Sequence, residues 1–380
     1  MDMEQKTYRV AQFGTFDVES MGDSLFPYAL SFGLKKFCAC DIELFSMREC
    51  ATPYNHNSHV YSFEQFATRH EKSPFDLVVL GGGEFLHFEA IDFMVDGQKK
   101  PYEGGYLWRK PAEMAKDATV PICVNCVGVP HDMTSVQQRE MHECLQDFSR
   151  VSVRDVFSEE RLKAAGVKNV VCAADNLWYM NEMYQGEEVT ELRRSLEKRT
   201  GRNFSTPYMI VQYGTTKNPA ALAEQLRVIK KKTGYRICLM PVNYCHEDRL
   251  GMEMLFKAGN GDFEMIDDYF QPPEMIAVIS GAKAFIGTSL HGNLTAASYG
   301  VPFVGIDMYS SFVSKMDGIF SMIDCEEFLV PHESAVAAAL LARLDNAEKG
   351  DAIAQKIKQC QEKLDQHFKN MADVLKKETL

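Results

Sequence analysis

Positive charge is scarce in this 380-residue sequence, in which 41 Lys and Arg residues stand against 53 Asp and Glu residues and give a formal net charge of −12. Binding to a nucleic-acid backbone needs a basic face, and adsorption to an anionic membrane needs clustered Lys and Arg. Long hydrophobic runs are also missing, since no stretch reaches the ~18 apolar residues that a membrane-spanning helix requires. These absences argue against nucleic acid and membrane as partners.

Features of exported proteins and of metal sites are few. Residues 1–6 have no apolar core like that of a signal peptide. Without an export signal, the eleven Cys residues are expected to be reduced thiols, which predicts a cytoplasmic location. Cys123 and Cys126 have the C-x-x-C spacing, but they lie on an apparent strand, where their side chains would point to opposite faces. No second C-x-x-C motif accompanies them, and nothing in the sequence demands a metal or another cofactor.

The dinucleotide fingerprint G-x-G-x-x-G is missing as well, which argues against an NAD site of the Rossmann type. In its place, Gly81-Gly82-Gly83-Glu84 follows the strongly apolar segment 75–80. Three successive glycines after a strand allow a ligand or a neighbouring element to approach the backbone closely. This turn therefore has two interpretations: contact with a ligand, or a tight exit from the strand.

The composition, with 46% hydrophobic and 25% charged residues, is that of a globular protein, and the length suffices for two domains. Short apolar segments alternate with helical segments twice along the chain, a pattern typical of parallel sheets covered on both faces. The first half predicts strands at 8–13, 41–45, 75–80, 120–124, 150–155 and 169–174. The second half predicts strands at 208–213, 235–241, 263–266, 284–286 and 303–306.

Two local predictions concern the first half. A helix is expected at 25–37 behind a cap at Asp23-Ser24, and an exposed loop at 47–62. The predicted organisation is an N-terminal α/β domain, a linker, a C-terminal α/β domain and a C-terminal helix, with boundaries at 1–180, 181–206, 207–345 and 346–380.

The chain is organised around the stretch 284–306, which predicts a strand, a polar turn, a short helix and a second strand. The turn holds Thr288, Ser289 and His291 at the start of the helix. Two hydroxyls, an imidazole and the free N–H groups of a helix N-terminus would then surround one point, which suits a phosphate or a carboxylate. The alternative is a well-capped turn, with Ser289 or Thr288 as the N-cap and His291 merely hydrogen-bonded.

Four stretches within residues 8–316 resemble the polysaccharide pyruvyl transferase family in their order and spacing. They are Met21-Gly22-Asp23; 79–83; 151–155 with Ser158, Leu162, Gly166-Val167 and Asp175; and 285–291 with Ala296-Ala297, 300–302 and Gly305-Ile306. Two positions depart from the family pattern. Many members carry Arg before Leu-His, where this chain has Ser289, and Asp175 is followed by Asn176 instead of the usual Pro. An Arg side chain would form a bidentate ion pair with a carboxylate or phosphate, and Ser cannot replace that charge.

The resemblance implies a GT-B-like α/β fold, in which two Rossmann-like parallel-sheet domains face a cleft and the C-terminal helix packs back on the first domain. It also implies a transferase that moves pyruvate from phosphoenolpyruvate, or from a similar anionic donor, to two hydroxyls of a sugar in a cell-surface polysaccharide, forming a ketal. The acceptor would be a lipid-linked or a free saccharide. Formation of a homo-oligomer is left open.

Ketal transfer needs a pocket for the anionic groups of the donor, an acid that protonates the methylene carbon and a base that receives a hydroxyl proton. We expect His291 to act as the acid or as the partner of the departing phosphate, while the N–H groups of Gly292 and Asn293 bind an anionic oxygen. The predicted catalytic residues are His291, Asp175 and Glu84. The predicted donor-binding residues are Thr288, Ser289, Leu290, Gly292, Asn293, Lys315 and Arg154, and the predicted acceptor-binding residues are Asp23, Gly82 and Gly83.

Each of these assignments has a plainer alternative. A surface ion pair would explain Lys315 and Arg154, and helix capping would explain Asp23. Two other functions also fit the sequence. A GT-B glycosyltransferase with a nucleotide-sugar donor would carry an aromatic or backbone pocket for the base beside 284–306. A non-catalytic sugar-binding relative would have lost the donor site together with the Arg.

Overall fold

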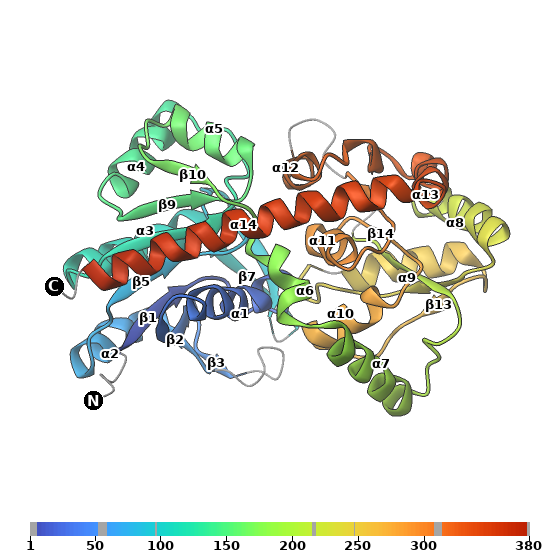
Figure 1. Ribbon diagram of the computed structural model, residues 1–380, viewed down its shortest axis with the longest axis horizontal. Helices are drawn as coiled ribbons and strands as arrows, with labels where there is room; N and C mark the ends of the chain where they lie inside the picture. The colour runs from blue at the N-terminus through green and yellow to red at the C-terminus, as the bar shows by residue number, and fades with distance from the viewer. Residues whose placement is uncertain are drawn as a thin grey trace. The chain divides into compact units, whose positions relative to one another are not determined.

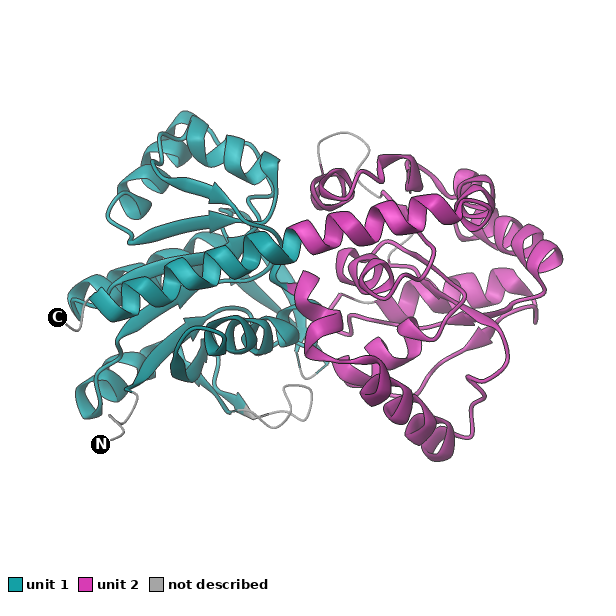
Figure 2. Cartoon of the chain, viewed as in Figure 1, with its two compact units in different colours: residues 1–176, 360–380 teal, residues 177–359 magenta. Residues whose placement is uncertain are grey.

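The computed structural model describes residues 6–51, 59–95, 97–214, 218–246, 248–307 and 314–377 (Figure 1). The chain divides into two compact units: unit 1 comprises residues 1–176 and 360–380, and unit 2 comprises residues 177–359 (Figure 2). Each unit has its own largely parallel sheet and its own buried core, which confirms the predicted α/β fold class. Within the described ranges, none of the helices combines the length and the hydrophobicity needed to cross a lipid bilayer.

Unit 1 is built on an eight-stranded sheet with the order β10-β9-β8-β5-β1-β2-β4-β3, in which only β3 runs antiparallel to its neighbour. The strands are β1 Thr7–Phe13, β2 Ala39–Ser46, β3 Cys50–Ala51, β4 His59–Ser62, β5 Leu77–Leu80, β8 Ile122–Val127, β9 Arg150–Val153 and β10 Val170–Cys172. The central strands β5 and β8 are buried along their whole length, as expected for a parallel sheet with helices on both faces.

The helices of unit 1 are α1 Met21–Lys35, α2 Phe66–Lys72 behind the short 3₁₀ segment η2 Phe63–Gln65, α3 Gly104–Asp117, α4 Ser135–Leu145 and α5 Val156–Ala164. The helix predicted at 25–37 begins at Met21, because Ser20 and not Asp23-Ser24 occupies the N-cap position. Asp23 therefore lies inside the first turn of α1, where its negative charge complements the helix dipole.

Two parts of unit 1 differ from the prediction. The range 47–62, expected to be an exposed loop, contributes β3 and β4 to the edge of the sheet, and its residues 52–58 lie outside the described part of the chain. A separate hairpin of β6 Ala90–Val95 and β7 Gln98–Glu103 was not predicted. Its second strand is rich in Lys and polar residues, so it lacks the apolar alternation by which strands are recognised.

Unit 2 is built on a six-stranded parallel sheet with the order β13-β12-β11-β14-β15-β16. The strands are β11 Tyr208–Gln212, β12 Arg236–Leu239, β13 Glu264–Met265, β14 Ala284–Gly287, β15 Phe303–Ile306 and β16 Leu329–Val330. The helices are α6 Met180–Met183, α7 Gly186–Thr200, α8 Pro219–Thr233, α9 Asp248–Gly259, α10 Pro272–Ser280, α11 Leu290–Ser298, α12 Lys315–Met322 and α13 Val336–Leu344. Short 3₁₀ segments are η3 Asn176–Tyr179, η4 Glu326–Phe328 and η5 Glu333–Ala335.

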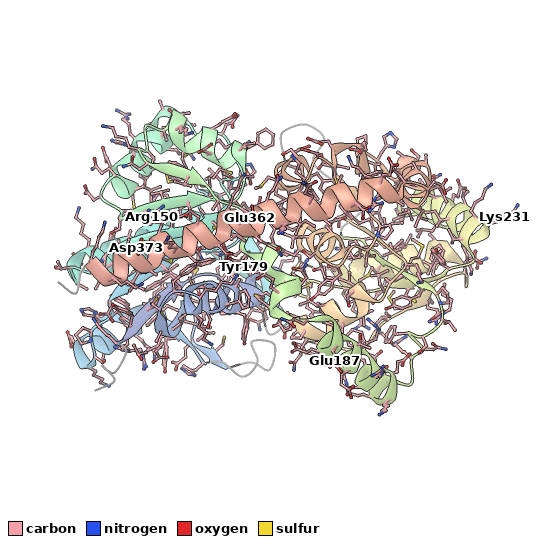
Figure 3. The ribbon with its side chains drawn as sticks, viewed as in Figure 1. Arg150, Tyr179, Glu187, Lys231, Glu362 and Asp373 are labelled. Carbon is pink, nitrogen blue, oxygen red and sulfur yellow. The ribbon has the colours of Figure 1, made fainter. Side chains whose placement is uncertain are left out.

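The range 181–206, predicted to be a linker, contains α7, which packs against α10 within unit 2. Charged side chains project from the helices of this unit (Figure 3). Glu187 lies in the first turn of α7 and Lys231 in the last turn of α8, and each complements the dipole of its helix.

The last helix, α14 Ala347–Lys377, begins in unit 2 and ends in unit 1. In unit 1, the ring of Phe368 fills the space that a side chain at Gly33 of α1 would occupy, since an added Cβ would lie 2.3 Å from the ring. His367 Nε2 lies 2.9 Å from Oδ1 of Asn125 on β8. These contacts confirm that the C-terminal helix packs on the first domain.

Candidate functional site

Each sheet has one point at which the strand order reverses. In unit 1 this point lies between β1 and β5, and in unit 2 it lies between β11 and β14. At such a point the connections from two neighbouring strands run in opposite directions and leave a crevice at the carboxyl edge, where ligands of open α/β sheets bind. The predicted site residues follow these strands or others of the same sheets, so each unit has its own group of candidate residues at the carboxyl edge of its sheet.

In unit 2, the turn after β14 is closed by hydrogen bonds at the start of α11. Ser289 is the N-cap, and its Oγ accepts the N–H of Gly292 at 3.3 Å. The N–H of Asn293 donates to the Ser289 carbonyl at 3.2 Å, and Asn293 Nδ2 donates to the carbonyls of Gly287 and Ser289 at 3.0 and 2.9 Å. The N–H groups of Gly292 and Asn293 are thus engaged inside the turn, contrary to the prediction that they bind an anion. The capped turn that was considered as the alternative is the observed arrangement.

The same turn is fastened to β11 by Gln212. Its Oε1 accepts the N–H of Ser289 at 2.8 Å and the hydroxyl of Thr288 at 3.3 Å. Thr288 Oγ1 in turn accepts the N–H of Gly214 at 3.0 Å. Sequence analysis missed Gln212, although one signal was present: it is the polar last residue of an otherwise apolar strand, and such residues lie at the carboxyl edge. Thr288 and Gln212 therefore position the turn.

Asp248, the first residue of α9, is a second group that the sequence analysis missed. It is almost fully buried, and its Oδ2 accepts the N–H groups of Asn243 at 2.9 Å and Val242 at 3.2 Å. Burial raises the pKa of this carboxyl to about 6, although hydrogen bonds from Asn243, Val242 and Gln212 favour the ionised form. Asn243 Nδ2 also lies 3.5 Å from Ser289 Oγ. A carboxyl that titrates near neutrality is thus linked to the turn through Gln212 and Asn243.

The remaining predicted residues of unit 2 surround this turn. His291 is partly exposed in the first turn of α11, and its carbonyl accepts the hydroxyl of Thr295 at 2.6 Å. The side chain of Leu290 is buried, so only its backbone is placed to contact a ligand. Lys315 is the partly exposed first residue of α12, a helix that packs against α11. An imidazole, a hydroxyl and a cation thus lie on neighbouring elements.

In unit 1, the glycine turn after β5 serves close packing. Gly81, Gly82 and Gly83 all have positive φ, at 94°, 105° and 75°, which disfavours any other residue. A Cβ on Gly82 would lie 2.1 Å from Phe26 of α1, so this helix already occupies the space beside the turn. A Cβ on Gly83 would lie 3.3 Å from Asp23 Oδ1, which places the Asp23 carboxylate beside the turn.

Asp23 accepts a hydrogen bond from Thr15 Oγ1 at 2.6 Å, on the loop that follows β1. Because Ser20 is the N-cap of α1, capping does not account for Asp23. The structure therefore brings together the three residues predicted to bind the acceptor, at the point where the strand order of unit 1 reverses.

Arg154 lies at the centre of three carboxylates. Its guanidinium nitrogens are 3.6 Å from Glu84 Oε1, 3.5 Å from Asp155 Oδ2 and 3.6 Å from Asp175 Oδ2, and the Arg154 side chain is only 2% exposed. Burial alone would lower the pKa of Arg154, but Glu84, Asp175 and Asp155 together raise it. A Cβ on Gly128 would lie 2.8 Å from the guanidinium, so a glycine there leaves room for it. Arg154 therefore forms ion pairs, but they are buried and not at the surface as the alternative supposed, and its charge is directed at acids of its own unit.

Two more buried groups near this edge were missed. The pKa of His87 is lowered by burial, which outweighs the opposite effect of Glu84 and Glu89. Burial also raises the pKa of Asp17, whose carboxylate accepts hydrogen bonds from Ser46 and Tyr102. Neither was visible in the sequence, because each contacts the unpredicted strand β7 or the residue after it: Asp17 accepts the hydroxyl of Tyr102, and a Cβ on Gly104 would lie 2.1 Å from His87 Nδ1. No cluster in the described ranges has three or more His, Cys, Asp or Glu side chains suited to a metal ion.

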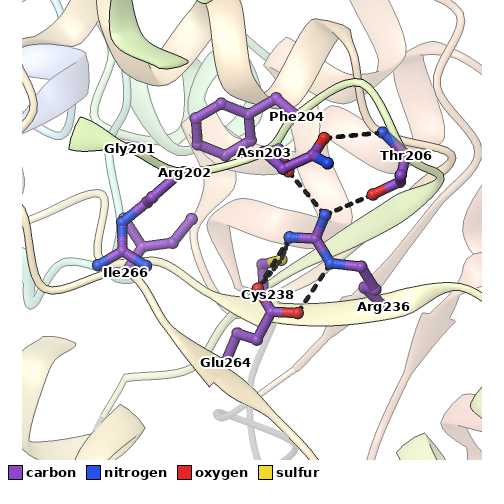
Figure 4. Close-up of a pocket in the computed structure, with 9 residues that line it drawn as sticks. All are labelled: Gly201, Arg202, Asn203, Phe204, Thr206, Arg236, Cys238, Glu264 and Ile266. Atoms are coloured by element: carbon purple, nitrogen blue, oxygen red, sulfur yellow. Dashed lines mark hydrogen bonds and ion pairs between the residues drawn. The ribbon is translucent and has the colours of Figure 1, made fainter. Parts of the chain in front are cut away.

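A pocket of about 480 Å³ lies elsewhere in unit 2, around the start of β12 (Figure 4). Its charged groups are paired: Arg236 binds Glu264 at 2.8 Å, and Arg202 binds Asp267 and Asp268. Arg236 is the first residue of β12, so this part of the pocket lies away from the carboxyl edge. We interpret the pocket as a surface depression lined by ion pairs that hold residues 201–206, the segment before β11, in place.

The family model for polysaccharide pyruvyl transferase matches residues 21–310. This range includes the carboxyl edges of both sheets and covers most of the chain, which therefore belongs to that family. No curated protein matches the sequence significantly.

Solved structures with a similar fold share little sequence with this chain. A UDP-GlcNAc 2-epimerase from Neisseria meningitidis, solved with UDP-GlcNAc, has a TM-score of 0.59 at 10% identity, over 94% of this chain and 99% of the epimerase. The Anabaena protein HepE, solved with UDP-glucose, has a TM-score of 0.56 at 11% identity, over 98% of each chain. The N-terminal domain of trehalose-6-phosphate phosphatase from Candida albicans has a TM-score of 0.57 at 9% identity, over 99% of this chain and 98% of that domain. These likenesses support the GT-B-like fold.

Proposed function

We propose that this member of the polysaccharide pyruvyl transferase family transfers pyruvate from phosphoenolpyruvate to two hydroxyls of a saccharide, forming a ketal and releasing phosphate. The main support is the pairing of a capped helix N-terminus with the imidazole of His291, a partly exposed residue whose Nε2 is buried, at the carboxyl edge of the unit 2 sheet. The N-terminus of a helix favours negative charge, and an imidazole can hold or deliver a proton near neutral pH.

The donor is assigned to unit 2. The phosphate or carboxylate of phosphoenolpyruvate would be held by the dipole of α11 and the ammonium group of Lys315, while the hydroxyl of Thr288, which donates to Gln212, positions the turn. The N–H groups of Gly292 and Asn293 are used by the turn, so they orient the helix instead of binding the donor. Lys315 supplies a positive charge in place of the Arg that many family members carry at the position of Ser289. Its ammonium group cannot bind an anion in the bidentate manner of Arg.

The acceptor is assigned to unit 1, where carboxylates predominate. Asp23 lies beside Gly83, and Glu84 and Asp175 both face Arg154. Three carboxylates around one guanidinium leave net negative charge, which suits the hydroxyls of a sugar better than an anionic donor. We therefore assign Arg154 to orient Glu84 and Asp175, which would receive the hydroxyl protons.

The proposed chemistry proceeds by addition and elimination at one carbon. His291 delivers a proton to the methylene carbon of phosphoenolpyruvate, and the first sugar hydroxyl attacks the adjacent carbon while its proton passes to a carboxylate. The bond from that carbon to the phosphate oxygen then breaks, and the second hydroxyl attacks to complete the ketal. The two hydroxyl protons balance those taken up by the methylene carbon and by the departing phosphate.

A nucleotide-sugar donor, as in a GT-B glycosyltransferase, is the second candidate. One observation favours it: the rings of Tyr244 and Tyr269 stack with centroids 4.9 Å apart at an interplanar angle of 20°. This pair begins one residue after Asn243, whose side chain lies 3.5 Å from Ser289 Oγ. An aromatic pair beside the 284–306 stretch is the feature expected of a base-binding site.

Ligand-dependent melting separates these candidates, because a ligand bound only by the native state raises the melting temperature. We expect stabilisation by phosphoenolpyruvate and none by UDP or GDP. Release of phosphate from phosphoenolpyruvate that requires an added saccharide, with a mass gain of one pyruvyl ketal on that saccharide, would establish the transfer. Stabilisation by a nucleotide alone would favour the glycosyltransferase, and binding of saccharides without either donor would favour a non-catalytic role.

A further inference from the structure

Two tyrosines form an aromatic platform at the carboxyl edge of the unit 2 sheet. Tyr244 follows β12 and Tyr269 follows β13, and these two strands are neighbours in the sheet. Their rings stack in a nearly parallel arrangement. Tyr269 is 44% exposed, whereas Tyr244 is partly buried behind it. The exposed ring of Tyr269 therefore stacks on the partly buried ring of Tyr244.

The platform is held in place by its backbone and by ion pairs. The hydroxyl of Tyr244 accepts the N–H of Phe270 at 3.0 Å, and Phe270 itself is fully buried. Arg202 binds both Asp267 and Asp268, the two residues before Tyr269 (Arg202 appears in Figure 4). An exposed aromatic side chain on a segment anchored from both sides keeps its orientation, so a ligand that stacks on it loses little freedom in ordering the protein.

The platform lies close to the turn after β14, residues 288–291, which the proposed function assigns to the donor. Asn243, the residue before Tyr244, donates its backbone N–H to Asp248 and places its side-chain amide 3.5 Å from Ser289 Oγ. Phosphoenolpyruvate has three carbons and no ring, so the donor of the proposed reaction leaves the tyrosines without a role.

We propose that the Tyr244–Tyr269 platform binds a pyranose ring of a saccharide, and that this ring is not the one whose hydroxyls react at the carboxylates of unit 1; the proposal rests on the assignment of a saccharide acceptor in the proposed function. The C–H face of a pyranose is apolar and covers an aromatic ring, while the sugar hydroxyls bind neighbouring polar groups. The carboxylate of Asp267 is 63% exposed next to the platform and is placed to accept hydroxyl hydrogen bonds. Asp267 and Asp268 share one cation, Arg202, so one net negative charge remains beside the platform; it opposes the phosphates of a nucleotide, and the surroundings therefore favour a neutral sugar.

The test measures binding directly on the full chain, without phosphoenolpyruvate. Saturation-transfer NMR is recorded with maltotriose, xylotriose, chitotriose, β-1,4-galactotriose and UDP as separate probes. The variants are Tyr269→Ala, which removes the exposed ring, Tyr269→Phe, which keeps it, and Phe256→Ala, which removes a 38% exposed ring on α9 as the matched control. We expect at least one oligosaccharide to bind, with affinity lowered about fivefold by Tyr269→Ala and unchanged by the other two variants.

Two outcomes would overturn this assignment: oligosaccharide binding that Tyr269→Ala does not weaken, or the absence of oligosaccharide binding from every probe. Binding of UDP that depends on Tyr269 would assign the platform to a nucleobase instead. The proposed transfer reaction is tested separately from the platform. Tyr269-dependent saccharide binding in a protein that never releases phosphate from phosphoenolpyruvate would leave the platform in place and remove the pyruvyl transfer.

Discussion

Gln212 and Ser289, which are 77 positions apart in the sequence, are joined by a hydrogen bond of 2.8 Å from the Ser289 N–H to Gln212 Oε1. The pairing of β11 with β14 places Gln212 opposite Gly287, so the bond links the carboxyl ends of two adjacent strands. The same serine caps α11 through its side chain. Ser289 therefore connects the sheet to the helix at the proposed donor turn.

Substitutions of Ser289 should separate its structural role from the charge at the turn. Ser289→Ala removes the cap and is expected to cost about 1 kcal/mol of stability. Ser289→Asp keeps a capping oxygen but adds a negative charge, so it should retain most of the stability and lose phosphoenolpyruvate binding through repulsion. Urea unfolding and ligand-dependent melting would measure the two effects. Equal phosphoenolpyruvate binding by wild type and Ser289→Asp would contradict an anion site at this turn.

His291→Ala should abolish transfer without unfolding the chain, because this residue is not fully buried and its imidazole is the proposed proton donor. Loss of a general acid is expected to lower kcat by about 10²–10⁴-fold. Phosphate release and circular dichroism provide the measurements. His332→Ala, at an exposed position of the same unit, is the matched control and should leave turnover unchanged. Turnover that survives in His291→Ala would remove the assigned role.

Arg154→Met should destabilise unit 1 by about 3–5 kcal/mol, because Glu84, Asp155 and Asp175 would lose the buried cation between them. Adding Glu84→Gln to this variant should restore part of the loss, since one of the opposed charges is then neutral. Urea denaturation followed by tryptophan fluorescence measures both. Arg194→Met, which breaks an exposed ion pair with Glu191, is the control and should change stability by less than about 1 kcal/mol. A similar small effect at Arg154 would show that the cluster is weakly coupled.

His367 should make unit 1 less stable in acid. Burial lowers its pKa to about 3 from the usual 6.5, so between these pH values the unfolded chain binds a proton that the native state does not bind. Stability due to this group is complete above pH 6.5 and is lost as pH falls towards 3, with a slope of up to about 1.4 kcal/mol per pH unit. His367→Gln should remove this slope while its amide still donates to Asn125. Urea unfolding at several pH values measures it, and identical slopes in the two proteins would contradict the prediction.

Asp248 should have the opposite effect in unit 2. Its pKa is raised by burial to about 6 from 3.8, so between these values the native state keeps a proton that the unfolded chain releases. The stability that this group contributes at low pH is therefore lost as pH rises from 3.8 to about 6. Asp248→Asn should abolish that decline, and comparison of the unfolding free energies of wild type and variant across this window tests it. A variant that still shows the full decline would assign it to another group.

Local pattern was sufficient to predict several features of the fold. The apolar segments of β5, β11, β14 and β15 stand out because strands covered on both faces are continuous hydrophobic runs. The edge strand β3 and the β6–β7 hairpin were missed, because edge and surface strands are short or polar and carry no such run.

The sequence by itself determined the two alternating α/β halves, the family, and the turn at Thr288, Ser289 and His291, because these depend on the order of residues along the chain. Only the tertiary structure decided which polar groups meet. Strand register brings Gln212 to Ser289, the loop after β12 brings Asn243 and Asp248 to the same turn, and the sheet of unit 1 gathers Glu84, Asp155 and Asp175 around Arg154. The physical reason is that parallel strands collect their carboxyl ends at one edge, so residues far apart in sequence become neighbours through pairings that local pattern does not encode.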